Sequence, residues 1–547
     1  MNTFVKNQPQ PSPKHSPEYA TIQRGTYILI AILALAAVLR LSHINQPYVD
    51  VFSWRQTSTA MMADNYYRTN WNIFFPEVSW GGAGPNYQGR EFQTVSYLSA
   101  LLYTVFGQQD WIGRSVAVLF GLWGIFALYQ LVRRIWDEER ALASAAMMAI
   151  MPGSIFIERS FLPDPAMVAL MTTSFWLFTA HLQTGRGLYL VAAAIVFVWG
   201  GLSKITGLIV GIPMLYALFS ILSRRRSLSA QRLLPIGIAI TLSLIPIAAY
   251  YLWARYLANN YPPYHFAGSG NWVWNKGVGH WLGELYFVPD FAASAYYWLW
   301  TVPIIILLLA GIAAPYLRRS FVTRSVDAPW LFHWWLLAVG IYYLIGADEL
   351  VDNPWNFHIF NPAIAALAGQ GMIAMAASIS SIAASALQQK LSPELVRKTA
   401  AVVSIAIILS TILSFGHVRL KSMYSRNWKQ QSYELELLLR QASQPGDLVV
   451  TMSSDLGDPN VIYYSRRRGW TFPPASNDID WSQFPPEEDA IQMFESLRER
   501  GADWLAIAQR HNRDFRANYP QVAEYISLFN DFSERKTRIV ELSVRSR

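Results

Sequence analysis

The sequence predicts an all-α multipass membrane protein that carries a small α/β domain at its C-terminal end. Hydrophobic residues make up 53% of the 547 residues and charged residues only 15%, whereas soluble proteins carry about 25% charged residues. The apolar residues gather in runs of about 18–22, which is long enough to cross a bilayer core of roughly 30 Å. From residue 418 onward the composition changes to that of a soluble domain.

About eleven transmembrane helices are expected, one at each apolar run. The runs lie at residues 26–44, 111–134, 141–157, 163–183, 187–202, 204–223, 233–253, 298–316, 329–346, 357–378 and 399–417. Arginine and lysine follow the second, sixth and eighth runs and precede the eleventh. Because such residues favour the cytoplasmic side, we expect the N-terminus in the cytoplasm and the C-terminus outside a plasma (inner) membrane.

These boundaries define three predicted regions. Residues 1–25 are polar and proline-rich, as expected of a disordered cytoplasmic tail. Residues 26–417 form the membrane domain, and residues 418–547 form the extracytoplasmic α/β domain. The formal charge of +8 is explained by the cytoplasmic loops, so no nucleic-acid partner is expected. The absence of cysteine excludes disulfides and thiolate metal sites.

Two long outer loops and the C-terminal region have distinct patterns. Residues 45–110 form the first loop, in which 92–106 are amphipathic and predict a helix at the membrane interface. Residues 254–297 form the second loop. In the C-terminal region we expect strands at 448–452, 504–508 and 539–542, and helices at 430–443, 486–500 and 518–528. This alternation indicates an α/β domain, and it contains no glycine-rich phosphate loop.

Charged side chains from separate parts of the chain are predicted to meet at the outer rim of the membrane. Asp50 follows the first span, Arg159 and Asp164 lie in the turn between the third and fourth, and Lys204 lies between the fifth and sixth. His358 begins the tenth span. Ionisable groups at such positions are costly to desolvate, so they indicate a functional site.

The order of these residues resembles that of the GT-C membrane glycosyltransferases, specifically the glycosyltransferase-39-like group. That group includes protein O-mannosyltransferases and the transferase that adds aminoarabinose to lipid A. The resemblance covers residues 26–378 and rests on five stretches: Asp50, Arg159 to Asp164, Lys204 to Gly207, Gly89 to Arg114, and His358 to Pro362. Two positions depart from the pattern. Val51 stands where many relatives carry a second acidic residue, and Ile359 stands where many carry tyrosine.

The resemblance implies inverting transfer of a sugar from a polyprenyl-phosphate donor to a lipid, glycan or protein acceptor on the outer face. Asp50 is the predicted base, because an acceptor hydroxyl must lose its proton as the new bond forms. Asp164 is the second predicted catalytic carboxylate; it could orient the acceptor, pair with Lys204, or bind a divalent cation together with Asp50. No cofactor is firmly expected, and metal use stays open.

The remaining candidates are cations and rings that would bind the substrates. Lys204, Arg55 and Arg159 are predicted to bind the donor phosphate, whose negative charge grows as it leaves. Trp54, His265 and His358 are further candidates for substrate binding.

Three other functions remain open at this point. The chain could be a surface-polysaccharide polymerase or ligase that also uses a lipid-linked donor. It could be a lipid or solute transporter, although such proteins commonly show paired halves with interrupted helices at the midplane. It could also be a membrane-anchored binding protein whose activity lies in residues 418–547.

Overall fold

The structure is a computed structural model, and it describes most of the chain. The described residues are 17–268, 270, 272–279, 291–293, 295, 299–317, 326–387, 392–453, 456–474, 484–532 and 537–545. The predicted disordered tail therefore lies largely outside the described residues, as does part of the second predicted outer loop.

Every predicted span coincides with a helix or with a pair of consecutive helices. They are α1 (Pro17–Leu41), α4 (Asp110–Ile135), α5 (Glu138–Ile150) with α6 (Pro152–Arg159), α7 (Asp164–Thr184), α8 (Gly187–Ser203), η2 (Ile205–Val210) with α9 (Gly211–Arg224), α10 (Ala230–Asn260), α14 (Thr301–Leu317), α15 (Leu331–Ile345), η5 (Pro354–Phe360) with α17 (Asn361–Leu387), and α18 (Pro393–Met423). The multipass helical fold is thus confirmed.

The helices differ in their ability to cross a bilayer. Within the described residues, seven are long and apolar enough to span a membrane, and an eighth results if α5 and α6 count as one span bent by 64°. Pro152 begins α6 directly after the break, and proline interrupts the hydrogen bonding of a continuous helix. The helices α8, α14 and α15 are shorter apolar helices.

Small residues allow close packing inside the bundle. Gly311 of α14 faces α17, where an added Cβ would stand 1.8 Å from the backbone oxygen of Leu367. Gly371 of α17 faces α14 in the same way, with the oxygen of Leu307 at 2.0 Å. Such contacts are typical of helix association in membranes, where backbones approach through small residues.

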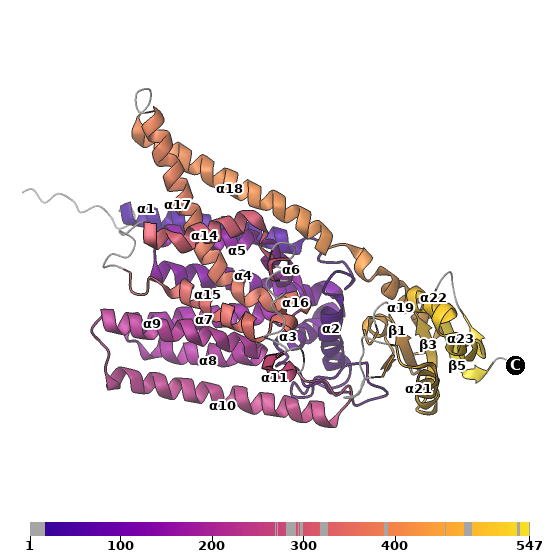
Figure 1. The fold of residues 1–547 in the computed structure, drawn as a ribbon. Coiled ribbons are helices and arrows are strands. Elements are labelled where there is room, and N and C mark those ends of the chain that lie inside the picture. The colour runs from indigo at the N-terminus through magenta and orange to yellow at the C-terminus, as the bar shows by residue number, and fades with distance from the viewer. Residues whose placement is uncertain are drawn as a thin grey trace, which may run out of the picture.

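Two further helices lie at the end of the bundle that carries the C-terminal domain, here called the domain side. They are α2 (Ser53–Arg68) and α3 (Thr94–Phe106), and both belong to the first long loop. Figure 1 shows them between the membrane bundle and the C-terminal domain. The helix α3 matches the predicted amphipathic stretch: Val95 and Tyr103 are buried, whereas Val105 and Phe106 are exposed.

The C-terminal region contains a five-stranded sheet in the order β2-β1-β3-β5-β4. The strands are β1 (Leu448–Met452), β2 (Arg468–Thr471), β3 (Ala502–Ile507), β4 (Phe529–Asp531) and β5 (Arg538–Arg545). The first three are parallel, and β5 and β4 are antiparallel to their neighbours. The helices are α19 (Gln430–Ala442), α20 (Asn460–Tyr463), α21 (Glu487–Glu499), α22 (Gln509–Asn518) and α23 (Pro520–Ser527). The predicted α/β domain is confirmed.

The first loop continues this sheet at its edge strand β2. The backbone N–H groups of Gly81 and Gly82 both donate to the oxygen of Gly469 at 2.7 Å, and Gly469 N donates to Ser79 O at 3.1 Å. Strand β2 is at the edge of the sheet, so its outer side is open to such pairing. The C-terminal domain is therefore hydrogen-bonded to the loop that precedes α3.

Asp64, on α2, has a buried carboxyl group that interacts with Arg466 of the C-terminal domain. Burial raises the pKa of Asp64 to about 7, although Arg68 and Arg466 lower it and Asp110 raises it further. Gln108 donates a hydrogen bond to one carboxyl oxygen, and the other is buried without a partner. An unpaired buried oxygen is costly when the carboxyl is charged.

Stability should therefore depend on pH through Asp64. The folded protein keeps the proton up to about pH 7, whereas an unfolded aspartate loses it near pH 3.9. Stability is thus lost as the pH rises through about 7. We expect Asp64→Asn to raise the Tm at about pH 8 by on the order of a few °C, and this gain should shrink towards about pH 5. Thermal unfolding of the detergent-solubilised protein checks this, and an equal gain at both pH values would contradict it.

Candidate active site

A cavity of about 930 Å³ opens at the domain side of the bundle. Its walls come from α2, the first loop, the turn after α8, described residues between His265 and Trp274, and the segment between α15 and η5. The ionisable side chains that line it are Arg55, Arg90, Glu91, Lys204, His265, Glu349 and Lys429. The charged groups of distant segments are thus brought to one place.

Lys204 is held at the cavity wall by two oxygen atoms. Its Nζ donates to Asp164 Oδ1 and to Asn356 Oδ1, both at 2.6 Å. Asp164 is fully buried and does not itself line the cavity, and its second oxygen has no hydrogen-bond partner. Of the three roles that the sequence left open for Asp164, this arrangement corresponds to the pairing with Lys204. The third hydrogen of the ammonium group remains available for a ligand.

Arg55 and Glu91 form the second charged pair of the cavity, with 2.8 Å between Arg55 Nη2 and Glu91 Oε2. Burial raises the pKa of Glu91, but the cations Arg55, Arg90 and Lys204 outweigh it and hold the pKa at about 2. Glu91 is therefore ionised throughout the physiological range. Its charge in turn offsets part of the positive charge of the cavity.

Arg90 differs from the other cations of the cavity because no close contact holds its side chain, although Glu91 and Glu349 interact with it electrostatically. Among the residues that the structure describes, its guanidinium makes no ion pair, and its Nε is buried without a hydrogen-bond partner. Burial and the like charge of Arg55 lower its pKa to about 9. A half-buried cation without a close countercharge is stabilised by a bound anion.

Aromatic rings line the other walls. Trp272 and Trp274 are stacked, with ring centroids 5.1 Å apart and an interplanar angle of 5°. Trp54, Trp80 and Trp355 also face the cavity. His265 lies beside Arg90 and Arg55; burial and these two cations hold the pKa of its imidazole well below the usual value, so the ring is neutral. Flat apolar faces with few polar groups suit a small organic ligand such as a sugar ring.

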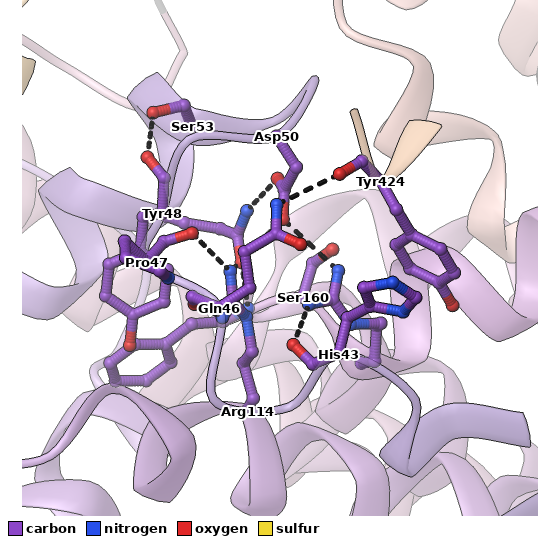
Figure 2. A network of polar contacts seen from close by, with 12 residues as sticks. His43, Gln46, Pro47, Tyr48, Asp50, Ser53, Arg114, Ser160 and Tyr424 are labelled. Atoms are coloured by element: carbon purple, nitrogen blue, oxygen red, sulfur yellow. Dashed lines mark hydrogen bonds and ion pairs between the residues drawn. The ribbon is translucent and has the colours of Figure 1, made fainter. Parts of the chain in front are cut away.

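Asp50 lies next to the cavity but does not line it. Its carboxylate is fully buried. It accepts hydrogen bonds from Gln56 Nε2 at 2.6 Å, Arg114 Nη2 at 3.1 Å and Arg159 Nη1 at 3.2 Å. Figure 2 shows Arg114 reaching both Asp50 and the backbone oxygens of Gln46 and Pro47. The carboxylate thus joins the first loop to α2, α4 and α6.

Some of the other residues predicted from the sequence line the cavity, and others lie away from it. Trp54, Arg55, Lys204 and His265 line the cavity. Arg159 belongs to the Asp50 cluster, where its guanidinium lies 4.7 Å from the ring centre of Tyr424. His358 is buried elsewhere, with Nε2 3.5 Å from Glu158 Oε1 and Nδ1 2.9 Å from Asn361 Nδ2. Neither Arg159 nor His358 lines the cavity.

The residues present do not fit a divalent cation between Asp50 and Asp164. The oxygens of Asp50 face two guanidinium groups and an amide donor, and Asp164 faces the ammonium group of Lys204. Within the described part of the chain, no three histidine, aspartate or glutamate side chains gather as metal ligands. Oxygen-ligated cations prefer several carboxylates, so no chemical step is assigned here to a metal.

Sequence reasoning missed several polar residues of the cavity, among them Arg90, Glu91, Glu349, Asn356 and Lys429. Arg90 and Glu91 lie inside the stretch from Gly89 to Arg114, which was noted as a family feature without a role for either residue. The sequence signal that could have indicated them is a pair of adjacent opposite charges directly before an amphipathic helix. Asn356 lies two residues before His358, in the same short helix η5.

Comparison with known proteins gives a family match over part of the chain. Residues 94–253 match the model of the dolichyl-phosphate-mannose-protein mannosyltransferase family. The STT3B subunit of the dolichyl-diphosphooligosaccharide–protein glycosyltransferase of Oryza sativa subsp. japonica is 27% identical over 188 residues, which is 32% of this chain and 26% of that protein. The Arabidopsis thaliana STT3B subunit is 26% identical over 215 residues, or 37% and 28%. The chain thus matches about a quarter of the length of these relatives.

Solved structures are similar over nearly the whole chain. ArnT from Cupriavidus metallidurans bound to undecaprenyl phosphate has a TM-score of 0.59 at 13% identity, covering 94% of this chain and 97% of that one. The apo oligosaccharyltransferase of Archaeoglobus fulgidus has a TM-score of 0.57 at 14% identity, covering 92% and 73%. At this identity the likeness establishes the arrangement of the helices.

Proposed function

We propose that this chain, a membrane enzyme with the GT-C glycosyltransferase fold, transfers a sugar from a polyprenyl-phosphate donor to an acceptor hydroxyl with inversion. The cavity would open on the outer face of a plasma membrane, in line with the positive-inside pattern of the loops. The lipid-linked donor is supported by the similar ArnT structure, which holds undecaprenyl phosphate. The acceptor class, whether lipid, glycan or protein, is left open.

The observation that carries the proposal is the group of cations in one cavity, of which Arg55, Arg90 and Lys204 are assigned to the phosphate. The fourth cation, Lys429, is paired with Asp458. A leaving phosphate gains negative charge as its bond to the sugar breaks, and cations already in place stabilise that charge. Arg90 is the group best prepared for the phosphate, because its Nε has no hydrogen-bond partner among the described residues and its side chain forms no ion pair there. The stacked Trp272 and Trp274 are then suited to the sugar ring.

The acceptor proton needs a carboxylate that the acceptor can reach. Glu91 lines the cavity, whereas Asp50 does not. With the cavity empty of substrate, Arg55 and Arg90 keep the pKa of Glu91 low. A phosphate that binds these two cations would compensate their charge, so the proton affinity of Glu91 would rise when the donor is bound. Glu91 is therefore the better-placed proton acceptor, and Asp50 positions α2 and Arg159.

The proposed reaction is a single displacement at the anomeric carbon. The acceptor oxygen forms its bond to that carbon on the face opposite the phosphate, while the bond from the carbon to the phosphate oxygen breaks. The acceptor proton passes to Glu91, and the bonding electron pair leaves with the polyprenyl phosphate. Arg55, Arg90 and Lys204 hold the resulting charge, with no further reactant needed.

Arg90→Gln tests the phosphate site. We expect turnover to fall by roughly 100-fold or more, as when one preorganised donor to a developing charge is removed. The purified protein in lipid nanodiscs is incubated with a polyprenyl-phosphate-linked sugar and a mixture of candidate acceptors, and product is detected by mass spectrometry. Arg255→Gln, a change in the exposed part of α10, serves as the control. Full activity of Arg90→Gln would remove the phosphate role from this residue.

The same assay separates the proposal from its rivals. A polymerase or ligase would use the lipid-linked donor but yield a lengthened or joined polysaccharide, so the acceptor in the product decides. A transporter would move substrate across sealed vesicles without any covalent product. Flux without product in the wild-type protein would overturn the proposed transfer.

A further inference from the structure

We propose that Arg68, Arg440 and Arg466 form a binding site for the head group of an anionic phospholipid, separate from the cavity. The three residues come from three distant segments and lie outside the lining of the cavity. The site does not take part in the proposed reaction. It would fix the C-terminal domain to the bilayer surface.

Specific contacts bring the segments that carry the three arginines to one region of the surface. Arg68 ends α2 and donates a hydrogen bond to Gln108. Arg466 follows the turn in which the Tyr464 hydroxyl donates to Asp110 Oδ2 at 2.7 Å. Arg440 lies in the last turn of α19, and its backbone oxygen accepts a hydrogen bond from Arg467 Nη2 at 3.2 Å.

The three arginines have no close anionic partner among the described residues. No described carboxylate forms an ion pair with any of the three, and all three side chains are exposed. Partial burial and then the positive charges of Arg466 and Arg68 lower the pKa of Arg440, in line with the contacts that gather these segments. Two acids interact with the cluster at longer range: Asp64 with Arg68 and Arg466, and Asp110 with Arg466. Asp64 is only partly ionised near pH 7. A phosphate would relieve the mutual repulsion.

The surrounding surface places this cluster at the depth of lipid head groups. Gln108 and Asp110 lie at the start of the span α4. On the nearby α3, Val105 is 73% exposed and Phe106 57%, and on α4 Leu119 is 64% exposed. Such side chains face lipid tails in a membrane protein, and basic groups just beyond them attract anionic lipid. The apolar surface beside the cluster favours a phospholipid over a soluble anion.

The test uses the full-length protein with Arg440→Gln and Arg466→Gln combined. Wild type and variant are purified in a neutral detergent, mixed with phosphatidylglycerol or phosphatidylcholine, and compared by native mass spectrometry and by thermal unfolding. We expect phosphatidylglycerol to bind and to raise the Tm of the wild type. The double variant should bind it about fivefold more weakly for each arginine removed. Arg500→Gln, an arginine on the same domain that contacts Trp470, should bind like the wild type.

Each other outcome counts against the proposal. Equal binding of phosphatidylglycerol by wild type and double variant would overturn it, as would equal binding of phosphatidylcholine. If inorganic phosphate alone gives the same Tm gain, the cluster is a site for soluble anions and not for lipid. A double variant whose Tm without lipid matches the wild type shows that the fold is intact and that the comparison is valid.

Discussion

Glu91→Gln is expected to lower the rate of sugar transfer by roughly 100- to 10,000-fold, the usual effect of removing a positioned general base. The amide keeps the size of the side chain and an oxygen that can accept the hydrogen bond now donated by Arg55 Nη2. It cannot accept the proton of the acceptor hydroxyl. Single-turnover rates with saturating lipid-linked donor measure the effect on the chemical step.

Glu77→Gln provides the matched control for this change. Glu77 belongs to the same loop and is also paired with an arginine, Arg468, but it does not line the cavity. We expect this variant to keep its turnover. Measuring donor affinity distinguishes a proton acceptor from a residue that only positions Arg55. In the second case, Glu91→Gln should mainly weaken donor binding. A variant with unchanged turnover at saturating donor would refute the role of Glu91 as proton acceptor.

The spans could be predicted because bilayer burial leaves a strong pattern in the sequence. Each apolar run coincides with a helix, since the hydrocarbon core requires both apolar side chains and internally satisfied backbones. The helix α2 was missed because it lies outside the membrane core and is rich in polar residues that are buried by tertiary contacts, among them Gln56 and Thr57. The edge strand β2 is only four residues long and contains Gly469, so its local signal was weak.

The site could be predicted only in part. Lys204, Arg55, Trp54 and His265 were singled out, and all line the cavity. The sequence shows that a charged residue lies near the membrane rim, but it does not show which neighbour takes up its charge. The two arginines that surround Asp50 come from positions 114 and 159. Only the folded structure shows that the Asp50 carboxylate is enclosed by protein, whereas the Glu91 carboxylate lines the cavity.

Asp50→Asn is expected to destabilise the protein by about 3–5 kcal/mol, because it leaves buried guanidinium groups without their countercharge. Asp50 accepts hydrogen bonds from Arg114, Arg159 and Gln56 at once. An asparagine amide would also turn one N–H group towards these donors. Denaturant or thermal unfolding in detergent measures the loss.

A second substitution separates the structural role of Asp50 from a chemical one. Adding Arg159→Met removes one of the two unbalanced charges and keeps a side chain of similar length over the Tyr424 ring, so the double variant should regain part of the lost stability. If Asp50 acts by positioning, some turnover should return with the stability. A double variant that is stable but inactive would instead support the sequence prediction that Asp50 takes the acceptor proton, and would require the first loop to move so that this carboxylate reaches the cavity.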